Sequence, residues 1–495
     1  MRRALLLLCA ALCCASLCWG CPKSEPTTKT PVNPDNDPRA LDERPKLGKP
    51  KPYRAIDPTV YQTPEGMKVW LVERPEVPMV SLALTLPRGS AEDPAGKSGL
   101  AHITASMLDE GAGDRDAIAI STAINDLGAQ MEASVDRDGS RITLTVLKKY
   151  LPQAFEIFAD VIARPRFDQA EWKRVSDLWK NQLKRRADNP QAVAMVVSTA
   201  ALYGPDTPYG HAPGGHVDTA EAMNLGDVKN FYKRIWRPDE ALLVVGGAVT
   251  RAELDALIQQ RLGNWKKPKE PAPVVPSPPA PLSTRPRLVL VDRPDAPQAV
   301  IAAVAPGIAA ADPNAAILDL VNTALGGSFT SRLNQNLRED RGWSYGARSS
   351  FVETRGVGPF VAQSAVFVNV TAPAVREVLT EIEKMATSGL TEDEFVKVRA
   401  RDLTSLIETH ETVDSLVGRL SSLALLGLPY DYDAKASAAR QQASRAAVAK
   451  LAATHLDPSK LSVIVVGPKK EVLPPLKSLG LGEPEMWTAE GRPLR

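Results

Sequence analysis

The sequence predicts an α+β fold of two homologous modules, each a mainly antiparallel sheet with helices packed on it, that together form a clam-like cleft. Three observations lead to this prediction. Short β-rich runs alternate with stretches of helical periodicity. A proline-rich segment divides the chain, and beyond it the order of the elements repeats with a period of roughly 220 residues.

Length and composition indicate a multidomain globular protein. The chain has 495 residues, of which 44% are hydrophobic, enough to bury more than one core. The 60 Lys and Arg residues nearly balance the 58 Asp and Glu residues, so the formal net charge is +2. Because no basic block is present, the composition excludes a nucleic-acid-binding protein and points to no polyanionic partner.

The N-terminus is typical of a signal peptide. Arg2 and Arg3 precede an apolar stretch from Ala4 to Leu17 that is too short to span a bilayer stably. Gly20 before Cys21 resembles the lipobox of bacterial lipoproteins, which implies a lipid anchor on Cys21. We therefore expect residues 1–21 to be a signal peptide with a lipobox-like Cys21. We expect the mature protein to lie on the periplasmic side of the bacterial outer membrane as a lipoprotein. The alternative is an ordinary cleaved signal in which Cys21 is incidental.

All five cysteines lie in this leader, so we expect a mature fold without a disulfide or a thiolate metal ligand. Residues 22–52 are rich in Pro, Thr, Lys and Asp and are too polar to fold, which suits a disordered tether.

The first module is predicted to occupy residues 53–265. Runs 67–75 and 78–89 are β-rich and are expected to pair as a hairpin, and 130–147 should form two strands joined at Asp138-Gly139. Helices are expected over 100–110, 117–127, 151–163 and 168–187, the last ending before Asp188-Asn189-Pro190. The apolar run 241–249 predicts a buried strand.

A semi-rigid linker is predicted over residues 266–287, where proline prevents a helix or a central strand. The second module, 288–490, repeats the order strand, turn, strand over 288–307. It continues with helices over 313–325 and 330–339, strands over 345–352 and 360–368, helices over 374–386 and 391–426, and a closing strand over 460–467.

The predicted helix that begins near Leu100 carries His102, and histidine is a common zinc ligand. A zinc hydrolase needs three protein ligands around an open fourth position and a carboxylate that takes a proton from the bound water. The inverted motif H-x-x-E-H supplies two histidine ligands on one helical face with the glutamate as general base.

The run from Ser98 to Asp138, "SGLAHITASMLDEGAGDRDAIAISTAINDLGAQMEASVDRD", resembles the first-module signature of the pitrilysin/insulinase type of zinc peptidases, the inverzincins. This family includes mitochondrial processing peptidase and two-subunit bacterial relatives. The resemblance extends through "TPYGHAPGGHVDTAEAMNLGDVKNFYKRIWRPDEALLVVGGAV" into the second module, from about Tyr53 to Gly467.

The chain departs from the family at the zinc site itself. H-x-x-E-H reads here as His102-Ile103-Thr104-Ala105-Ser106, so Ala105 stands for the base and Ser106 for the second ligand. The resemblance places Gln182, or with less support Asn181, where the family has its third ligand, a glutamate. A neutral amide is a poor zinc ligand compared with a carboxylate, and we expect no zinc and no other cofactor in this chain.

The other histidines offer no replacement for this site. His211 and His216 lie in a Gly/Pro-rich loop, and His410 and His455 lie on predicted helices without Cys or a second His nearby.

The second module retains the other functional element of the family. In "GGSFTSRLNQNLREDRGWSYGARSSF" the resemblance matches Arg338 and Tyr345 to an arginine and a tyrosine that reach the cleft of the zinc module. A tyrosine hydroxyl can donate to an oxyanion and an arginine can hold carbonyls or carboxylates. The alternative is a solvated helix whose arginines pair with Glu339 or Asp340, beside an aromatic at a strand edge.

We therefore expect a non-catalytic subunit of a heterodimeric zinc metallopeptidase. It would supply Arg338 and Tyr345 in trans to a partner that carries zinc and an intact H-x-x-E-H, and its peptidase activity would exist only in that pair. The alternative is a peptidase-like scaffold or a peptide- or protein-binding lipoprotein without a catalytic role. A self-contained zinc peptidase is a weaker possibility, because the chain has only five histidines.

Overall fold

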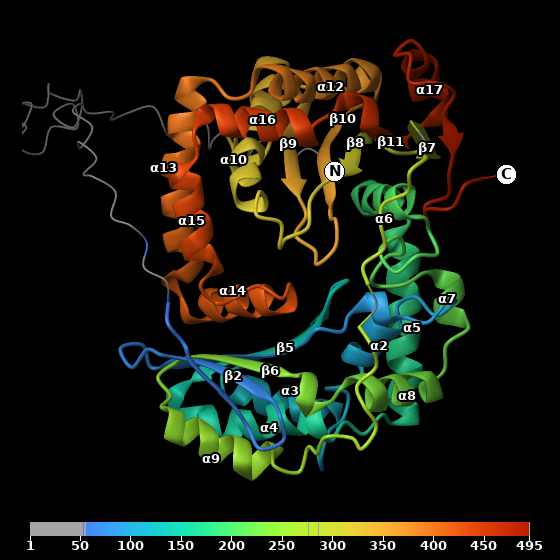
Figure 1. Cartoon of the computed structure of the whole chain (residues 1–495). Helices are drawn as coiled ribbons and strands as arrows, with labels where there is room; N and C mark the ends of the chain where they lie inside the picture. The colour runs from blue at the N-terminus through green and yellow to red at the C-terminus, as the bar shows by residue number, and fades with distance from the viewer. Residues whose placement is uncertain (1–52, 54–55, 276, 286, 495) are drawn as a thin grey trace, which may run out of the picture. The chain divides into compact units, whose positions relative to one another are not determined.

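The computed structural model describes residue 53 and residues 56–275, 277–285 and 287–494 (Figure 1). The predicted signal peptide, Cys21 and almost all of the tether lie outside the described residues. Within the described part, no helix combines the length and the apolar character needed to cross a bilayer.

Two six-stranded sheets form the framework. The first sheet has the order β1-β2-β6-β3-β5-β4 and the second the order β12-β7-β11-β8-β10-β9. The strands of the first sheet are β1 (Thr59–Gln62), β2 (Lys68–Glu73), β3 (Met79–Leu86), β4 (Gln130–Val135), β5 (Ser140–Leu147) and β6 (Leu242–Gly247). Those of the second are β7 (Leu288–Asp292), β8 (Gln298–Pro306), β9 (Ser344–Phe351), β10 (Pro359–Phe367), β11 (Ser462–Gly467) and β12 (Glu485–Met486). The order of β2 to β6 recurs in β7 to β11, which confirms the predicted repeat.

The predicted hairpin of residues 67–75 and 78–89 is wrong. Strand β6 lies between β2 and β3, parallel to β2 and antiparallel to β3. All six residues of β6 are buried, and a strand without a polar face is stable only with a neighbour on each side. The second sheet repeats this arrangement with β11 between β7 and β8.

Helices cover both sheets. The first half of the chain contains α2 (Leu100–Ser106), α3 (Ala117–Asp126), α4 (Leu151–Ala163), α5 (Gln169–Arg186), α6 (Pro190–Tyr203), α7 (Val217–Glu221), α8 (Leu225–Ile235) and α9 (Arg251–Leu262). The second half contains α10 (Ala315–Leu325), α11 (Arg332–Asn334), α12 (Thr371–Ser388), α13 (Glu392–Glu411), α14 (Val413–Leu425), α15 (Tyr432–Gln442), α16 (Arg445–His455) and α17 (Lys469–Lys477).

Two predicted helices differ from the observed ones. The helix expected over 391–426 is two helices, because Thr412 adopts an extended conformation between them and its hydroxyl caps α14 by accepting from the N–H of Ser415. The helix expected over 330–339 is the short α11 followed by a π-helix, η6 (Gln335–Asp340).

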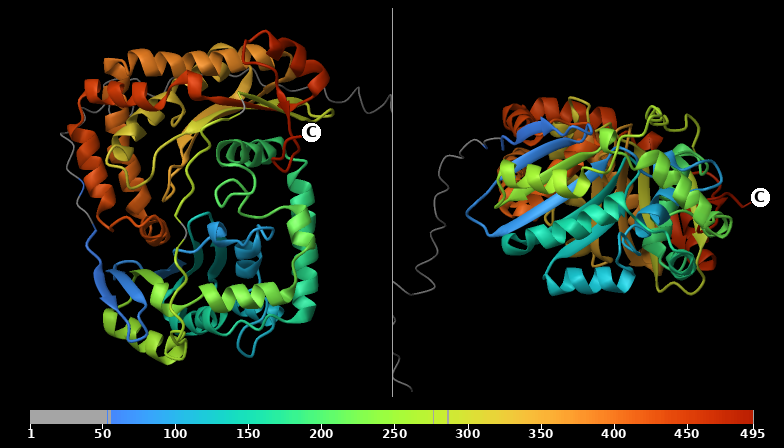
Figure 2. Two further views of the ribbon diagram at one scale, coloured as in Figure 1. Left: turned by 45° about the vertical axis from the view of Figure 1, so that its right-hand side comes forward. Right: turned by 90° about the horizontal axis from the view of Figure 1, so that it is seen from below.

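One helix of each half packs on the sheet of the other half. Helix α6 packs on the second sheet, where Val193 and Val197 join a core with Val289 and Val300 (Figure 2). Helix α14 packs on the first sheet, with Leu416, Val417 and Leu420 against residues such as Ala83 and Val244. The two halves therefore share cores and stabilise one another.

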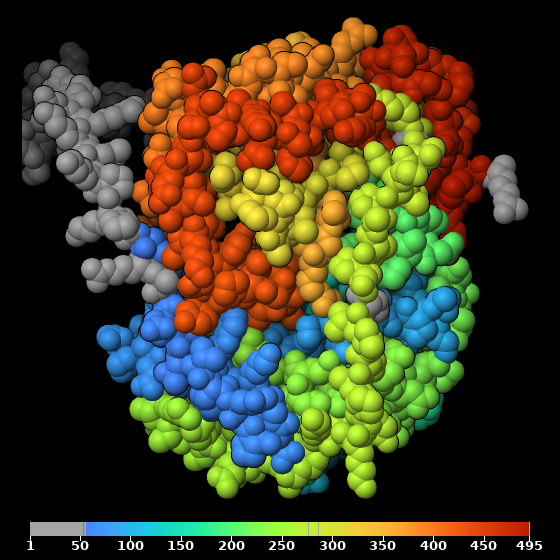
Figure 3. All heavy atoms as spheres, viewed as in Figure 1, coloured from blue at the N-terminus to red at the C-terminus, as the bar shows by residue number. Residues whose placement is uncertain are grey.

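Buried arginines hold the proline-rich linker against the first half. Arg88 donates to the carbonyl of Pro273, and Arg237 donates to the carbonyl of Glu270 over 3.0 Å. Both side chains are at most 2% exposed. The linker then crosses the surface towards the second half (Figure 3). The predicted linker boundaries, 266 and 287, stay a prediction.

Candidate functional site: a degenerate zinc helix and an exposed Arg/Tyr element

Helix α2 is fixed at its N-terminus by a buried carboxylate. Asp93 accepts hydrogen bonds from the N–H groups of Gly99, over 2.6 Å, and Ala101, over 2.7 Å. Burial raises the pKa of Asp93 to about 8, although these hydrogen bonds oppose the increase. Gly99 has a φ of 92°, and a Cβ there would lie 2.7 Å from the ring of Trp179 and 2.8 Å from Gly215. Only glycine fits this position.

The three motif positions on α2 have different surroundings. His102 is partly buried; desolvation lowers its pKa, and the positive charge of Arg186 lowers it further. Ala105 is 2% exposed and belongs to the first core. Ser106 donates from Oγ to the carbonyl of His102 over 3.0 Å, which turns its hydroxyl back onto the helix. Neither of the two replaced positions offers a ligand to a metal.

Helix α5 does not complete a metal site. Gln182 is exposed, whereas the next residue, Leu183, is buried in the first core. One turn further along, Arg186 donates to the carbonyl of Gly215 over 2.8 Å and to Oε2 of Glu490 over 2.7 Å. The same Glu490 oxygen lies 2.5 Å from Nδ1 of His216. Arg186, held by these hydrogen bonds, is therefore the charged residue of α5 that lowers the pKa of His102.

These residues do not fit zinc. A catalytic zinc site needs three ligands, and His102 is the one ligand type left among the motif positions. Within the described ranges, no group of three or more His, Cys, Asp or Glu side chains converges in a way that could hold a metal ion. A cation at His102 would also meet the positive charge of Arg186.

The remaining histidines have structural surroundings. His216 is the N-cap residue of α7. Its backbone N–H donates to the side chain of Thr219 as part of a capping box. His211 is buried, and burial lowers its pKa. His410 is buried at the end of α13, where its Nδ1 lies 2.9 Å from the carbonyl of Leu406. His455 ends α16, and burial lowers its pKa as well.

Arg338 and Tyr345 both lie at the surface of the second half. Arg338 is on η6 with its side chain 40% exposed, 3.3 Å from Glu339 and stacked 4.6 Å above the ring of Phe329. Tyr345 is the second residue of β9 and is 86% exposed. Phe329 is itself 64% exposed, so the element presents an arginine and two aromatic rings to solvent. Among the described residues, no hydrogen bond or ion pair joins this element to α2 or α5.

A buried asparagine that the sequence analysis did not identify holds this element together. Asn334 donates to the carbonyl of Phe329 over 2.6 Å and accepts from the N–H of Ala347 over 3.2 Å. It thereby fixes the loop before α11 to the edge strand β9. An asparagine inside a predicted helix gives no signal of such a contact, because its partners are known only once the strand is placed.

A groove of about 1190 Å³ runs beside strand β4 in the first half. The side chains of Gln130, Met131 and Glu132 line it together with residues of α3 and α14. All the charged residues of its lining except Arg174 are acidic, and Ile118 on α3 is 78% exposed. Helix α2 packs beside β4, so the groove lies next to the degenerate zinc helix.

The outer edge of β4 is open. The backbone N–H of Asp136 donates to the carbonyl of Gly139, so these two residues form a hydrogen-bonded pair of the antiparallel ladder. Backbone orientation alternates along a strand, so the even-numbered residues of β4 point their N–H and C=O groups to β5. Those of Met131, Ala133 and Val135 point outward. These outward groups have no hydrogen-bond partner among the described residues.

Two domain models of one family match the sequence. The first, described as "Insulinase (Peptidase family M16)", matches residues 68–206. The second, described as "Peptidase M16 inactive domain", matches residues 222–401. Together they span parts of both halves, including α2, Arg338 and Tyr345.

Individual proteins agree with this match. An uncharacterized zinc protease of Mycobacterium bovis is 26% identical over 351 residues, covering 71% of this chain and 80% of the relative. A "non-peptidase homolog" of Helicobacter pylori is 22% identical over 400 residues, covering 80% and 90%. The crystal structure of a peptidase M16 inactive domain from Pseudomonas fluorescens superposes with a TM-score of 0.75 at 25% identity, covering 83% of this chain and 98% of that one.

Proposed function

Because the chain belongs to peptidase family M16, the insulinase family, we propose that it is the non-catalytic subunit of a heterodimeric zinc metallopeptidase. The observation that carries the proposal is the contrast between the two functional elements of the family. At α2 the base and the second ligand are replaced by a buried Ala105 and a back-bonded Ser106. In the second half, Arg338 and Tyr345 are present and exposed.

In this proposal the exposed Arg/Tyr element acts in trans. In the partner subunit, zinc would supply the activated water that attacks a peptide carbonyl, and the carbonyl oxygen would become an oxyanion. The hydroxyl of Tyr345 would donate a hydrogen bond to that oxyanion, and Arg338 would hold a neighbouring carbonyl or carboxylate of the substrate. The side chain of Arg338 stacks on the ring of Phe329 in the free subunit. Substrate binding would therefore lose less of the conformational entropy of this side chain.

The groove beside β4 would contribute half of a peptide chamber. An extended peptide could add to β4 by pairing with the outward backbone groups of Met131, Ala133 and Val135. Such main-chain pairing needs no residue of the lost zinc site. This subunit would thus bind substrate although it cannot activate water.

The first test uses the purified chain alone. We expect metal analysis to find no stoichiometric zinc, and a peptide library to remain intact. Cleavage by the pure chain that a chelator abolishes would contradict the proposal.

The second test uses the reconstituted pair. The partner is sought by co-purification and as an adjacent reading frame with an intact H-x-x-E-H. In the active pair, Arg338→Ala or Tyr345→Phe should lower turnover by about 100- to 1000-fold with unchanged zinc content, the range for loss of one oxyanion contact. Arg376→Ala, on the exposed face of α12, is the matched control and should have no effect. Unchanged turnover in both variants would leave Arg338 and Tyr345 with structural roles only.

The open edge of β4 also supports a second candidate, a peptide- or protein-binding scaffold without turnover. The discriminating result is a peptide that binds this chain with the same affinity whether or not a zinc-bearing partner is present, and that the mixture never cleaves. Saturable binding with no cleavage in the reconstituted mixture favours the scaffold.

We further propose that Cys21 carries a lipid anchor and holds the protein at the periplasmic side of the outer membrane. Metabolic labelling with an alkyne fatty acid should label the wild-type chain and leave Cys21→Ser unlabelled. Equal labelling of both forms, or none of either, would contradict the anchor.

A further inference from the structure

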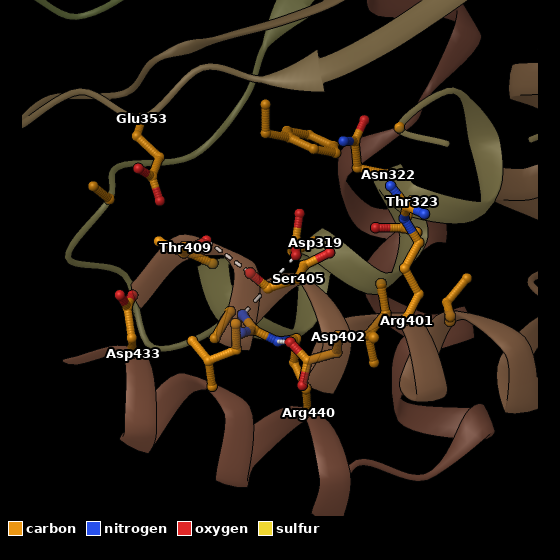
Figure 4. A pocket seen from close by; sticks show the side chains of 18 of the residues that line it. Asp319, Asn322, Thr323, Glu353, Arg401, Asp402, Ser405, Thr409, Asp433 and Arg440 are labelled. Carbon is orange, nitrogen blue, oxygen red and sulfur yellow. Dashed lines mark hydrogen bonds and ion pairs between the residues drawn. The ribbon is translucent and has the colours of Figure 1, made fainter. Parts of the chain in front are cut away.

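A second cavity lies within the second half, away from the Arg/Tyr element. It has a volume of about 410 Å³ and is formed by α10, α13, α15, Arg419 in the middle of α14, and the segment after β9 (Figure 4). Neither Arg338 nor Tyr345 lines it. Its volume falls within the range of small-molecule sites.

The helices turn polar faces towards this cavity. On α10, Asp319 and Thr323 are one turn apart, and on α13, Asp402, Ser405 and Thr409 follow one another at three- and four-residue spacing. Facing helices normally pack apolar residues against each other. Apolar side chains, among them Phe351, also form part of the wall.

Two of the arginines at the cavity are fully engaged by neighbouring carboxylates. Arg419 binds Asp433 through two nitrogens, the shorter contact being 2.7 Å, and reaches Glu353 over 3.0 Å. Arg440 donates from Nε to Asp402 over 2.5 Å. These pairs largely neutralise the charges of Arg419 and Arg440.

Asp319 has the weakest pairing of the carboxylates at the cavity. Its nearest cation is Arg440, with Nη1 4.0 Å from Oδ2, and the described residues offer it no hydrogen-bond donor. Its side chain is 57% exposed although protein surrounds it, because it opens onto the cavity. Burial raises the pKa of Asp319, with Arg440 opposing the increase and Asp402 and Glu353 adding to it. A cationic group beside Asp319 would stabilise its ionised form.

Glu353 provides a second acceptor at the cavity. One of its oxygens accepts from Arg419, and its side chain is 47% exposed. The ring of Phe351 and that of Tyr432 also line the cavity, and aromatic rings attract cations. The donor set suits an organic cation better than a metal ion, because no three or more metal-ligating side chains converge within the described ranges.

We infer that this cavity binds a small organic cation, a primary ammonium or guanidinium group on a short alkyl chain, with Asp319 as its anchor. Arg401 distinguishes two sources of such a group. It lies on α13 on the side of Asn322 and Thr323, and it has no ion pair among the described residues (Figure 4). A basic amino acid could place its carboxylate against Arg401, whereas a polyamine has no group for this residue.

The test is calorimetric titration of the mature chain at constant ionic strength. The probes are putrescine, spermidine, L-lysine and L-arginine, with 1,4-butanediol as the uncharged isostere of putrescine. We expect saturable binding of at least one of the amines or guanidines and none of butanediol. Absence of saturable heat for all four cations at millimolar concentration would overturn the inference.

Variants locate the site. Asp319→Asn should weaken binding at least tenfold and should fold normally, since the described residues give Asp319 no hydrogen bond and its ion pair with Arg440 is long, at 4.0 Å. Ser405→Leu, which fills the cavity, should also abolish binding. Glu408→Gln, on the exposed face of α13, is the control and should bind as the wild type does. Binding unaffected by both Asp319→Asn and Ser405→Leu would overturn the inference.

Arg401→Gln separates the two ligand sources. Weaker binding of lysine and arginine with unchanged binding of polyamines supports a basic amino acid as the ligand. Unchanged binding of all four probes supports a polyamine. Both outcomes retain Asp319 as the anchor. The inference does not rest on the proposed peptidase role, because the cavity shares no lining residue with either family element.

Discussion

The edge strands β4 and β9 occupy equivalent places in the two sheets, yet one edge is open and the other is closed. At β9, the outward N–H of Ala347 donates to Asn334 and that of Ser349 donates to the carbonyl of Gly326, over 3.2 Å each. At β4, the outward backbone groups have no partner among the described residues. Edge strands template further pairing unless they are covered. The first half can therefore bind through its main chain and the second half through exposed side chains such as Tyr345.

The contrast also applies to the family elements beside each edge. Next to β4, α2 has exchanged its ligands for groups that stabilise the fold, since Ala105 is buried and Ser106 bonds its own helix. Next to β9, Arg338 and Tyr345 are exposed. In the proposed function, the two halves of the chain would thus contribute different parts of a single activity.

The largest expected effect concerns the buried motif position. We expect Ala105→Glu to lower the free energy of unfolding by roughly 2–5 kcal/mol, because a carboxylate at this 2% exposed position loses its hydration without gaining a cation. Urea denaturation at neutral pH measures it. Ala119→Glu, on the exposed face of α3, is the control and should change stability little. A loss of stability as small as that of the control would mean that α2 can still accommodate the glutamate of the family motif at this position.

Opening the closed edge should have the next largest effect. Asn334→Ala removes an acceptor for Ala347 and a donor to Phe329 from a buried position, and should lower the free energy of unfolding by about 1–3 kcal/mol. Thermal or urea unfolding measures the change. The neighbouring exposed Gln335→Ala serves as control. If both variants unfold alike, Asn334 does not close this edge.

Blocking the open edge should affect binding rather than stability. Ala133→Pro removes an outward N–H that no ladder uses, so we expect little change in the melting temperature but at least a tenfold loss of peptide affinity, about 1.4 kcal/mol. Fluorescence anisotropy with a labelled peptide measures the affinity. Ala347→Pro removes a bonded N–H and should instead lower the melting temperature. Peptide affinity that survives Ala133→Pro would place the peptide elsewhere.

The smallest effect is a pH dependence at α2. The pKa of His102 is lowered from 6.5 in the folded state, so its contribution to stability is present above that pH and is lost as the pH falls below it. Arg186→Gln removes one of the two causes and should raise the His102 pKa. Proton NMR of the imidazole signals across a pH titration tests this. An unchanged His102 pKa would show that burial alone accounts for the shift.

Much of the fold was predictable because local patterns coincide with the elements. The helix break before Pro190 appears as predicted, with Asn189 capping α6 by accepting from the N–H of Ala192. The break at Thr412 was missed, because a threonine between two apolar stretches resembles any residue of a continuous helix. The position of β6 between β2 and β3 was missed for a different reason. Its paired residues are roughly 160 positions from those of β3, and such a distant pairing leaves no local signal in the sequence.

The sequence by itself determined the repeat and the residues that stand at the motif positions, among them Ala105 and Ser106, because residue identity and spacing are written in the chain. Only the tertiary structure decided that Asn334 closes one sheet edge while the other stays open, that the charge of Arg186 lowers the pKa of His102, and that Asp319 has no hydrogen-bond donor among the described residues. Each of these depends on which distant segments meet. Hydrogen bonds and charges act over a few ångströms, so their partners are fixed only when the chain has folded.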